Sequence, residues 1–217
     1  MTPLNQLTAM ACPLGLSNVD TDQLIPARFM KRSRGEGYGQ FLLHDLRFDQ
    51  AGAAVPDFPL NMPQADSCRI LVARRNFGGG SSREAAVYAL VDFGFRCVIA
   101  PSFGDIFTGN AVNNGLLPAR VAESDCAAIL KKLDGAVGTI SVDLERQEIG
   151  IKGTGFAFEI DPTARRKLLN GWDDIDLTAQ YAAEINRFVR QDATRRPWAQ
   201  SIARTSPDPV TQKPADS

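Results

Sequence analysis

The sequence has 217 residues, 44% of them hydrophobic and 23% charged, which is ordinary for a globular protein with one substantial core. Its 24 basic and 25 acidic side chains give a net charge of −1, and the basic residues form no stripe that could follow a nucleic-acid backbone. No apolar run approaches membrane-spanning length. These features argue against binding to nucleic acid or insertion into a membrane, and they predict a cytoplasmic protein.

The first part of the chain predicts an extended segment followed by a turn. Residues 7–13 favour the extended segment. The dense Asn, Asp and Thr of residues 18–22 favour turns in which side chains bond to the backbone, and Pro26 suits the first turn of a short helix. Asp20 and Asp22 could instead ligate a hard cation, but the other ligands of a calcium loop are absent, so turn chemistry is the preferred interpretation.

A glycine-rich stretch at residues 34–39 predicts a mobile connection that could order over a ligand. Arg32 and Arg34 could meet an anion there, or they could simply be solvated. Residues 38–48 predict a helix, and residues 49–67, which contain several prolines and glycines, predict a long connection.

The middle of the chain predicts a strand, a glycine loop, a helix and a second strand parallel to the first. Residues 69–74 and 96–100 are apolar runs typical of strands that are covered on both faces. Residues 84–93 are apolar enough for a packed helix, which Gly94 would cap. The connecting loop, residues 76–84, reads NFGGGSSRE.

This loop is the candidate site. Its three consecutive glycines let the backbone approach a ligand closely, and the helix start points unpaired N–H groups at an anion. Arg83 adds a planar fork suited to a carboxylate or phosphate. A local interpretation, a capping box of Ser81 and Glu84, fits equally well and does not exclude a ligand. The loop lacks the Lys of a Walker loop and the third glycine of a dinucleotide fingerprint, so a small carboxylate is favoured over a nucleotide.

The metal-binding side chains are sparse. The four cysteines lie mostly in apolar runs, without the short spacings of zinc or iron–sulfur motifs, at positions Cys12, Cys68, Cys97 and Cys126. We expect reduced thiols in the core and no metal bound by this chain alone. A Ser-His-Asp triad would have to use the only histidine, His44, whose apolar surroundings in the sequence favour a structural role.

Helices and strands continue to alternate after residue 100. The segments with strand patterns are residues 116–121, 139–144, 147–151 and 155–160. The segments with helical patterns are a short one that ends at residues 113–115, then residues 123–133, 162–171 and 177–191. We therefore expect an α/β domain with a mixed sheet over residues 1–200, and a disordered tail at residues 201–217, where polar residues and prolines replace the apolar pattern.

Three segments together resemble the small subunits of 3-isopropylmalate dehydratase (isopropylmalate isomerase), relatives of the swivelling domain of aconitase. They are NVDTDQLIPARF at residues 18–29, NFGGGSSRE at residues 76–84, and IAPSF, DIF and GLLP within residues 99–118. Residues 37–48 also match the bacterial form. The resemblance spans residues 4–200 and implies a swivelling β/β/α fold with a mixed sheet and flanking helices.

The resemblance also implies a division of labour between two chains. A separate large subunit would carry a 4Fe–4S cluster, whose open iron binds the substrate, and this chain would close over the other side in a heterodimer or higher hetero-oligomer. The substrates would be small dicarboxylates: 2-isopropylmalate and 3-isopropylmalate would be interconverted by loss and return of water, in leucine biosynthesis. This chain alone is expected to have little activity.

Site residues follow from the same resemblance. Ser81 would be the base that removes a proton next to a carboxylate. The substrate-binding set is Gly80, Ser82, Arg83, Asp20, Thr21 and Arg28. The family usually has cysteine in place of Gly79 and histidine in place of Ala85, and these two departures could change the rate or the substrate.

Three alternatives stay open at this point. A paralogue would act on a smaller methyl-substituted malate or maleate, such as 2-methylmalate or citraconate. A stand-alone carboxylate-binding or regulatory module would use the same loop without an iron–sulfur partner. A nucleotide-binding protein would need phosphate affinity, which the loop motif does not favour.

Overall fold

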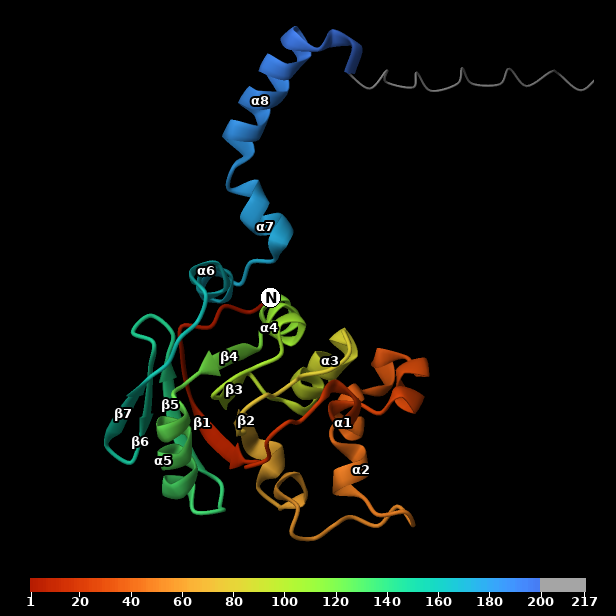
Figure 1. Ribbon diagram of the computed structural model, residues 1–217, viewed down its shortest axis with the longest axis vertical. Coiled ribbons are helices and arrows are strands. Elements are labelled where there is room, and N and C mark those ends of the chain that lie inside the picture. Colours follow the sequence, from red (N-terminus) through yellow and green to blue (C-terminus); the bar gives the residue numbers. More distant parts are fainter. Residues whose placement is uncertain (200–217) are drawn as a thin grey trace, which may run out of the picture. The chain divides into compact units, whose positions relative to one another are not determined.

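The computed structural model describes residues 1–199 and divides into a unit of residues 1–177 and a second unit that begins at Thr178 (Figure 1). The strands are β1 Gln6–Pro13, β2 Cys68–Val72, β3 Cys97–Ala100, β4 Leu117–Arg120, β5 Gly138–Asp143, β6 Glu148–Ile151 and β7 Thr154–Ala157. The α-helices of the described residues are α1 Thr21–Leu24, α2 His44–Arg47, α3 Glu84–Phe93, α4 Asp105–Asn113, α5 Glu123–Leu133, α6 Pro162–Asn170, α7 Asp174–Ala179 and α8 Ala182–Arg195. The tail predicted at residues 201–217 lies outside the described residues, and a single domain over residues 1–200 stays a prediction.

A seven-stranded mixed sheet, in the order β4-β3-β2-β1-β5-β6-β7, organises the first unit. β1 is the junction of two halves, because it pairs in parallel with β2 and antiparallel with β5. β2, β3 and β4 are parallel to one another, while β5, β6 and β7 form an antiparallel meander. This topology confirms the predicted α/β class with a mixed sheet. Pro118, which cannot donate to a sheet ladder, lies on the edge strand β4.

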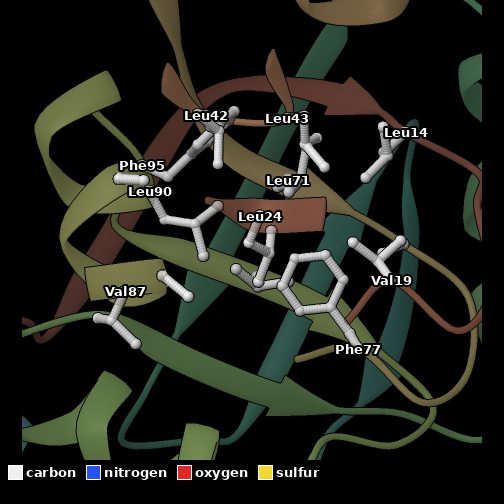
Figure 2. Packing of buried hydrophobic residues seen from close by; sticks show 14 of the residues in the cluster. Leu14, Val19, Leu24, Leu42, Leu43, Leu71, Phe77, Val87, Leu90 and Phe95 are labelled. Atoms are coloured by element: carbon white, nitrogen blue, oxygen red, sulfur yellow. The ribbon is translucent and has the colours of Figure 1, made fainter. Parts of the chain in front are cut away.

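Two hydrophobic cores cover the two faces of the sheet. Leu71 of β2 belongs to one core with Leu90 of α3, while its neighbour Ile70 belongs to the other with Ile129 of α5. α3 and α5 accordingly lie on opposite sides of the strands in Figure 1. In the first core, Phe77 of the glycine loop packs among Leu24, Leu71 and other leucines (Figure 2). Burial on both faces explains why the parallel strands are apolar without alternation.

Two predicted helices are wrong in their extent. The helix expected at residues 38–48 is split into a 3-10 turn, Tyr38–Phe41, and the short helix α2. Leu43 causes the break: it is fully buried, it adopts a left-handed conformation with φ of 51°, and its N–H donates to the Leu24 carbonyl at 3.0 Å. A tertiary contact therefore overrides helical propensity.

The helix expected at residues 177–191 is likewise two helices, α7 and α8. Between them the Tyr181 N–H donates to the Thr178 carbonyl at 3.0 Å, in a turn tighter than an α-helix. Within α8 the spacing of Ile185, Phe188 and Val189 places three apolar side chains along one face.

All four cysteines are free and buried, as predicted. Burial is the main cause that raises the pKa of Cys12 to about 12 and that of Cys126 to about 11, so these groups stay protonated thiols at neutral pH. None of the helices in the described part of the chain has the length and apolar composition that a membrane crossing requires.

The two-sided core predicts a large cost for Leu71→Ala. Leu71 is 0% exposed, so the substitution should lower the free energy of unfolding by about 2–5 kcal/mol in urea denaturation, because it leaves a cavity under α3. Ile175→Ala is the control, because Ile175 is 78% exposed and should change this free energy by less than about 0.5 kcal/mol. Equal losses for the two variants would contradict the described core.

Candidate active site

The glycine loop lies where the carboxyl ends of three parallel strands meet. Residues 76–83 follow β2, residues 14–20 follow β1, and residues 101–104 follow β3. Ligand sites of α/β sheets form at this edge, in the crevice outside the strand ends. Parts of the three segments that carry the sequence resemblance therefore come together in space, although they are far apart along the chain.

Backbone hydrogen bonds join the glycine loop to the segment after β1. The N–H of Gly78 donates to the Val19 carbonyl at 2.7 Å, and the N–H of Thr21 donates to the Gly79 carbonyl at 2.9 Å. Asp20 and Gly79 form an isolated parallel bridge. The loop is thus paired like a short strand, which fixes its path without using side chains.

The segment after β3 holds the other side of the loop. Phe77 donates its N–H to the Ser102 carbonyl at 3.0 Å and accepts from the N–H of Gly104 at 2.9 Å. The N–H of Asn76 donates to Ser102 Oγ at 2.8 Å. Gly104 is also the residue before α4, so this contact brings the start of α4 against the loop.

Two glycines are required by close packing here. Gly78 has φ of +71°, and a Cβ on it would lie 2.3 Å from Cγ of Phe107. A Cβ on Gly104 would lie 2.5 Å from the carbonyl oxygen of Gly78. Both distances are too short for any side chain, so the loop and α4 approach as closely as they do only because both positions are glycine.

The predicted capping box of Ser81 and Glu84 is wrong. α3 begins at Glu84, and the residue before it, Arg83, makes no side-chain capping hydrogen bond. Oε1 of Glu84 instead accepts from Nδ2 of Asn114 at 2.9 Å. Ser81 lies before the helix, in the exposed part of the loop, because Gly80 turns the chain there with φ of +92°.

Asp20 and Thr21 support the loop from α1. The carboxylate of Asp20 accepts from the N–H of Gln23 at 2.7 Å, and Oε1 of Gln23 accepts from the N–H of Asp20 at 3.0 Å, which is a capping box. Thr21 is 2% exposed, and its hydroxyl donates to the Ser81 carbonyl at 2.9 Å. The turn-and-cap interpretation of this segment is confirmed. The Thr21 hydroxyl is used in a hydrogen bond that holds the glycine loop.

Arg83 carries the positive charge at the site. Its side chain is 17% exposed and forms an ion pair with Asp22, whose own side chain is 56% exposed. The contact joins Nη1 of Arg83 to Oδ1 of Asp22, so Asp22 engages one end of the planar guanidinium. Gly80, Ser81 and Ser82, which directly precede Arg83 on the loop, are exposed to solvent.

Arg28 is not brought to this loop. It forms an ion pair with Asp45, lies 4.5 Å from the centroid of the Phe29 ring, and is 53% exposed. The hydrogen bond from Arg28 is the main cause that lowers the pKa of Asp45 to about 2. None of the side-chain hydrogen bonds found for Arg28 within the described residues reaches the glycine loop.

Sequence reasoning missed three residues that shape the site: Asp22, Ser102 and Gly104. The sequence predicts Asp22 in a turn, with a cation ligand as the alternative, and not as the partner of Arg83, although its place beside Asp20 in the same motif was the available signal. Ser102 and Gly104 lie between the apolar strand and helix α4, and no pattern within that segment indicates which residues bond to a distant loop.

Comparison with known proteins shows the family of this chain. A family model described as the aconitase C-terminal domain matches residues 1–124. The 3-isopropylmalate dehydratase small subunit of Rhodospirillum centenum is 46% identical over 92% of this chain and 99% of its own length. That of Caulobacter vibrioides is 43% identical over 93% of this chain and 100% of its own. The chain belongs to the family of 3-isopropylmalate dehydratase small subunits, within the aconitase C-terminal domain family.

A solved structure extends the comparison to the fold. The crystal structure of 3-isopropylmalate dehydratase from Methanocaldococcus jannaschii matches with a TM-score of 0.60 and 26% identity, over 84% of this chain and 99% of that one. The predicted swivelling fold of the aconitase type is therefore confirmed.

The Thr21 hydroxyl bond predicts a local effect of Thr21→Val. Without the donor, the Ser81 carbonyl loses its partner and the loop should open more often, so trypsin should cleave after Arg83 about tenfold faster. Thr21→Ser keeps the hydroxyl and should keep the slow cleavage. Equal cleavage rates for the two variants would show that this bond does not hold the loop.

The Arg28–Asp45 pair predicts a defined acid dependence. Because the pKa of Asp45 falls from an ordinary 3.8 to about 2 on folding, the pair stabilises the fold fully above about pH 4 and loses this effect as the pH falls towards 2. The difference in urea midpoint between the unaltered chain and Asp45→Asn should shrink over this interval. A constant difference from pH 5 to pH 2 would contradict the assignment.

Proposed function

We propose that this chain is the small subunit of a 3-isopropylmalate dehydratase, a hydro-lyase that interconverts 2-isopropylmalate and 3-isopropylmalate in leucine biosynthesis. The observation that carries the proposal is identity of 43% to 46% with small subunits of that name over nearly their whole lengths. The loop supports it, because the exposed residues Gly80, Ser81 and Ser82 directly precede the partly buried Arg83, a combination suited to an anionic substrate.

A large subunit completes the enzyme in this proposal and holds the 4Fe–4S cluster, in a heterodimer or a higher hetero-oligomer. When bound there, the cluster supplies a Lewis-acid iron for the carboxylate and hydroxyl of the substrate. The described residues include no group of three or more metal-binding side chains, and the four cysteines are buried thiols. In this proposal the chain's own residues act on the substrate from the side opposite the cluster.

Arg83 binds a substrate carboxylate. Asp22 engages Nη1 and leaves the rest of the guanidinium fork for a second carboxylate, while the pairing keeps the long side chain in one orientation. Asp22 is more exposed than Arg83, so the substrate can displace its carboxylate from Arg83, and the displaced carboxylate is then solvated rather than buried. Ser82, which precedes Arg83 and is exposed, would add a hydroxyl for the substrate.

Ser81 removes the proton from the carbon next to a carboxylate. A serine alkoxide is a poorly stabilised anion, and the start of α3 contributes only about 0.3–1 kcal/mol to it while the site is exposed to water. Closure against the large subunit excludes water and strengthens the contributions of the loop N–H groups and Arg83. This requirement explains why activity is expected only from the assembled complex.

The smaller methyl-substituted malates are the competing substrates. The names of the relatives favour isopropylmalate. A Cβ at Gly79 would lie 3.0 Å from Oδ1 of Asn76 and 3.5 Å from its Cγ and Nδ2, so a side chain there would require a small shift of Asn76. Assays of the assembled enzyme with both kinds of substrate separate the two proposals.

The central test is Ser81→Ala in the complex reconstituted anaerobically with the large subunit from the same genome. The variant should still assemble, and kcat for 2-isopropylmalate should fall by about 100-fold to 10,000-fold, because the proton acceptor is gone. Ser141→Ala, on strand β5, is the matched control and should retain the rate of the unaltered complex. Turnover near normal in Ser81→Ala would rule out this role, and turnover of only the smaller acids by the unaltered complex would overturn the isopropylmalate assignment.

A further inference from the structure

One helix, α4, contacts both ends of the stretch that carries the candidate site residues. This stretch begins at Gly78, which follows the buried Phe77, and it ends at Glu84, the first residue of α3. Residues 81–83, which include the proposed base and the proposed carboxylate-binding arginine, lie between these ends. The position of α4 therefore bears on the position of the site.

The first turn of α4 supports the Gly78 end of the stretch by packing. The Phe107 ring lies so close to Gly78 that a Cβ on this glycine would be 2.3 Å from Cγ of Phe107. The rings of Phe77 and Phe107 meet edge to face, with their centroids 5.4 Å apart. Phe107 is 3% exposed, and the N–H of Gly104, just before α4, donates to the Phe77 carbonyl at 2.9 Å. A ring packed this closely fixes the backbone that lies against it.

The residue that closes α4 holds the Glu84 end by a hydrogen bond. Nδ2 of Asn114 donates to Oε1 of Glu84 at 2.9 Å. The same nitrogen donates to the carbonyl of Asn110, one turn earlier in α4, also at 2.9 Å. The second bond holds the Asn114 amide against its own helix, so the amide is already oriented for Glu84. A hydrogen bond to a carboxylate is also stronger than one to a neutral acceptor.

α4 is in turn fixed to α6 by a buried lysine. Nζ of Lys167 donates to Oδ1 of Asn113, the last residue of α4, at 2.5 Å and to Oδ1 of Asp174 at 2.6 Å. The side chain of Lys167 is 7% exposed. A buried charge that loses one of its partners is strongly destabilising, so this contact keeps the end of α4 in place beside Asn114.

We propose that α4 braces the site stretch at both ends, and that Phe107 and Asn114 are positioning residues for the dehydratase reaction. Asn114 acts through Glu84 on the adjacent Arg83, and therefore on substrate affinity. Phe107 acts through the loop backbone on the placement of Ser81, and therefore on the rate of proton transfer. This inference rests on the proposed function, but the brace itself is a property of the chain alone.

Hydrogen–deuterium exchange of the full-length chain tests the brace at its Asn114 end. Asn114→Asp replaces the donor by a second carboxylate beside Glu84, so amides of residues 83–87 should exchange about tenfold faster. Asn170→Asp is the matched control, because Asn170 closes α6 and likewise donates to the carbonyl four residues earlier, that of Arg166, at 2.8 Å. It should leave the exchange of residues 83–87 unchanged. Unchanged exchange in Asn114→Asp, or equal acceleration in Asn170→Asp, would overturn the brace.

Kinetics of the reconstituted complex test the role of Asn114. Asn114→Asp should raise KM for 2-isopropylmalate about tenfold with a smaller change in kcat, because Arg83 is displaced with Glu84. The double variant Asn114→Asp, Glu84→Gln again has one donor and one acceptor, in the reverse direction, and should recover most of the lost affinity. No recovery in the double variant, or a fall in kcat at constant KM in the single one, would contradict this role.

Phe107→Leu tests the other end of the brace in the same assay. kcat should fall about tenfold with KM nearly unchanged, because the loop backbone that carries Ser81 loses its support. Phe95→Leu is the matched control: Phe95 is 0% exposed in the same core and stacks on Phe93, with centroids 5.2 Å apart, so kcat should be retained. Equal falls in kcat for the two variants would overturn the role of Phe107. Absence of isopropylmalate turnover in the unaltered complex would instead refute the proposed function, while the exchange experiment would still decide the brace.

Discussion

The site depends on backbone hydrogen bonds between loops that follow three neighbouring parallel strands. The backbone N–H of Phe77 donates to the Ser102 carbonyl, and that of Gly78 donates to the Val19 carbonyl. Backbone bonds alone therefore join the glycine loop to both neighbouring segments. Phe77 is also buried in the core under α3. The strand order of the sheet and the packing of its core therefore determine where Ser81 and Arg83 stand. A rigid support of this kind is what a catalytic group on an exposed loop requires.

Charge balance is the second constraint on this loop. Arg83 is the cation of this loop and pairs with Asp22, while two further acids, Asp20 and Glu84, stand nearby in the same motif segments. Each of these has a partner already: Asp20 caps α1, Asp22 binds Arg83, and Glu84 accepts from Asn114. In the proposed function, the part of the Arg83 guanidinium that Asp22 does not engage binds the anionic substrate. A similar pairing joins Arg34, of the glycine-rich stretch at residues 34–39, to Asp92 of α3.

The sequence allowed much of the fold to be predicted and only part of the site. The parallel strands, α3 and its Gly94 cap were predictable, because continuous apolar runs and a terminal glycine are local signals. The break at Leu43 was not, since it depends on a bond to Leu24 that no local pattern encodes. The loop motif identified Ser81 and Arg83 as candidates. The residues that contact the loop, Asp22, Ser102 and Gly104, could not be predicted, because their contacts depend on how the three segments fold together.

The most direct test of the account is the affinity of the assembled complex for 2-isopropylmalate, measured by calorimetry. If the loop binds a carboxylate through Arg83 and reserves Ser81 for proton transfer, Ser81→Ala should bind the substrate as tightly as the unaltered complex. Arg83→Lys, which keeps the charge but loses the planar fork, should bind it at least about tenfold more weakly. Unchanged affinity in Arg83→Lys, or a large loss in Ser81→Ala, would contradict this division of roles.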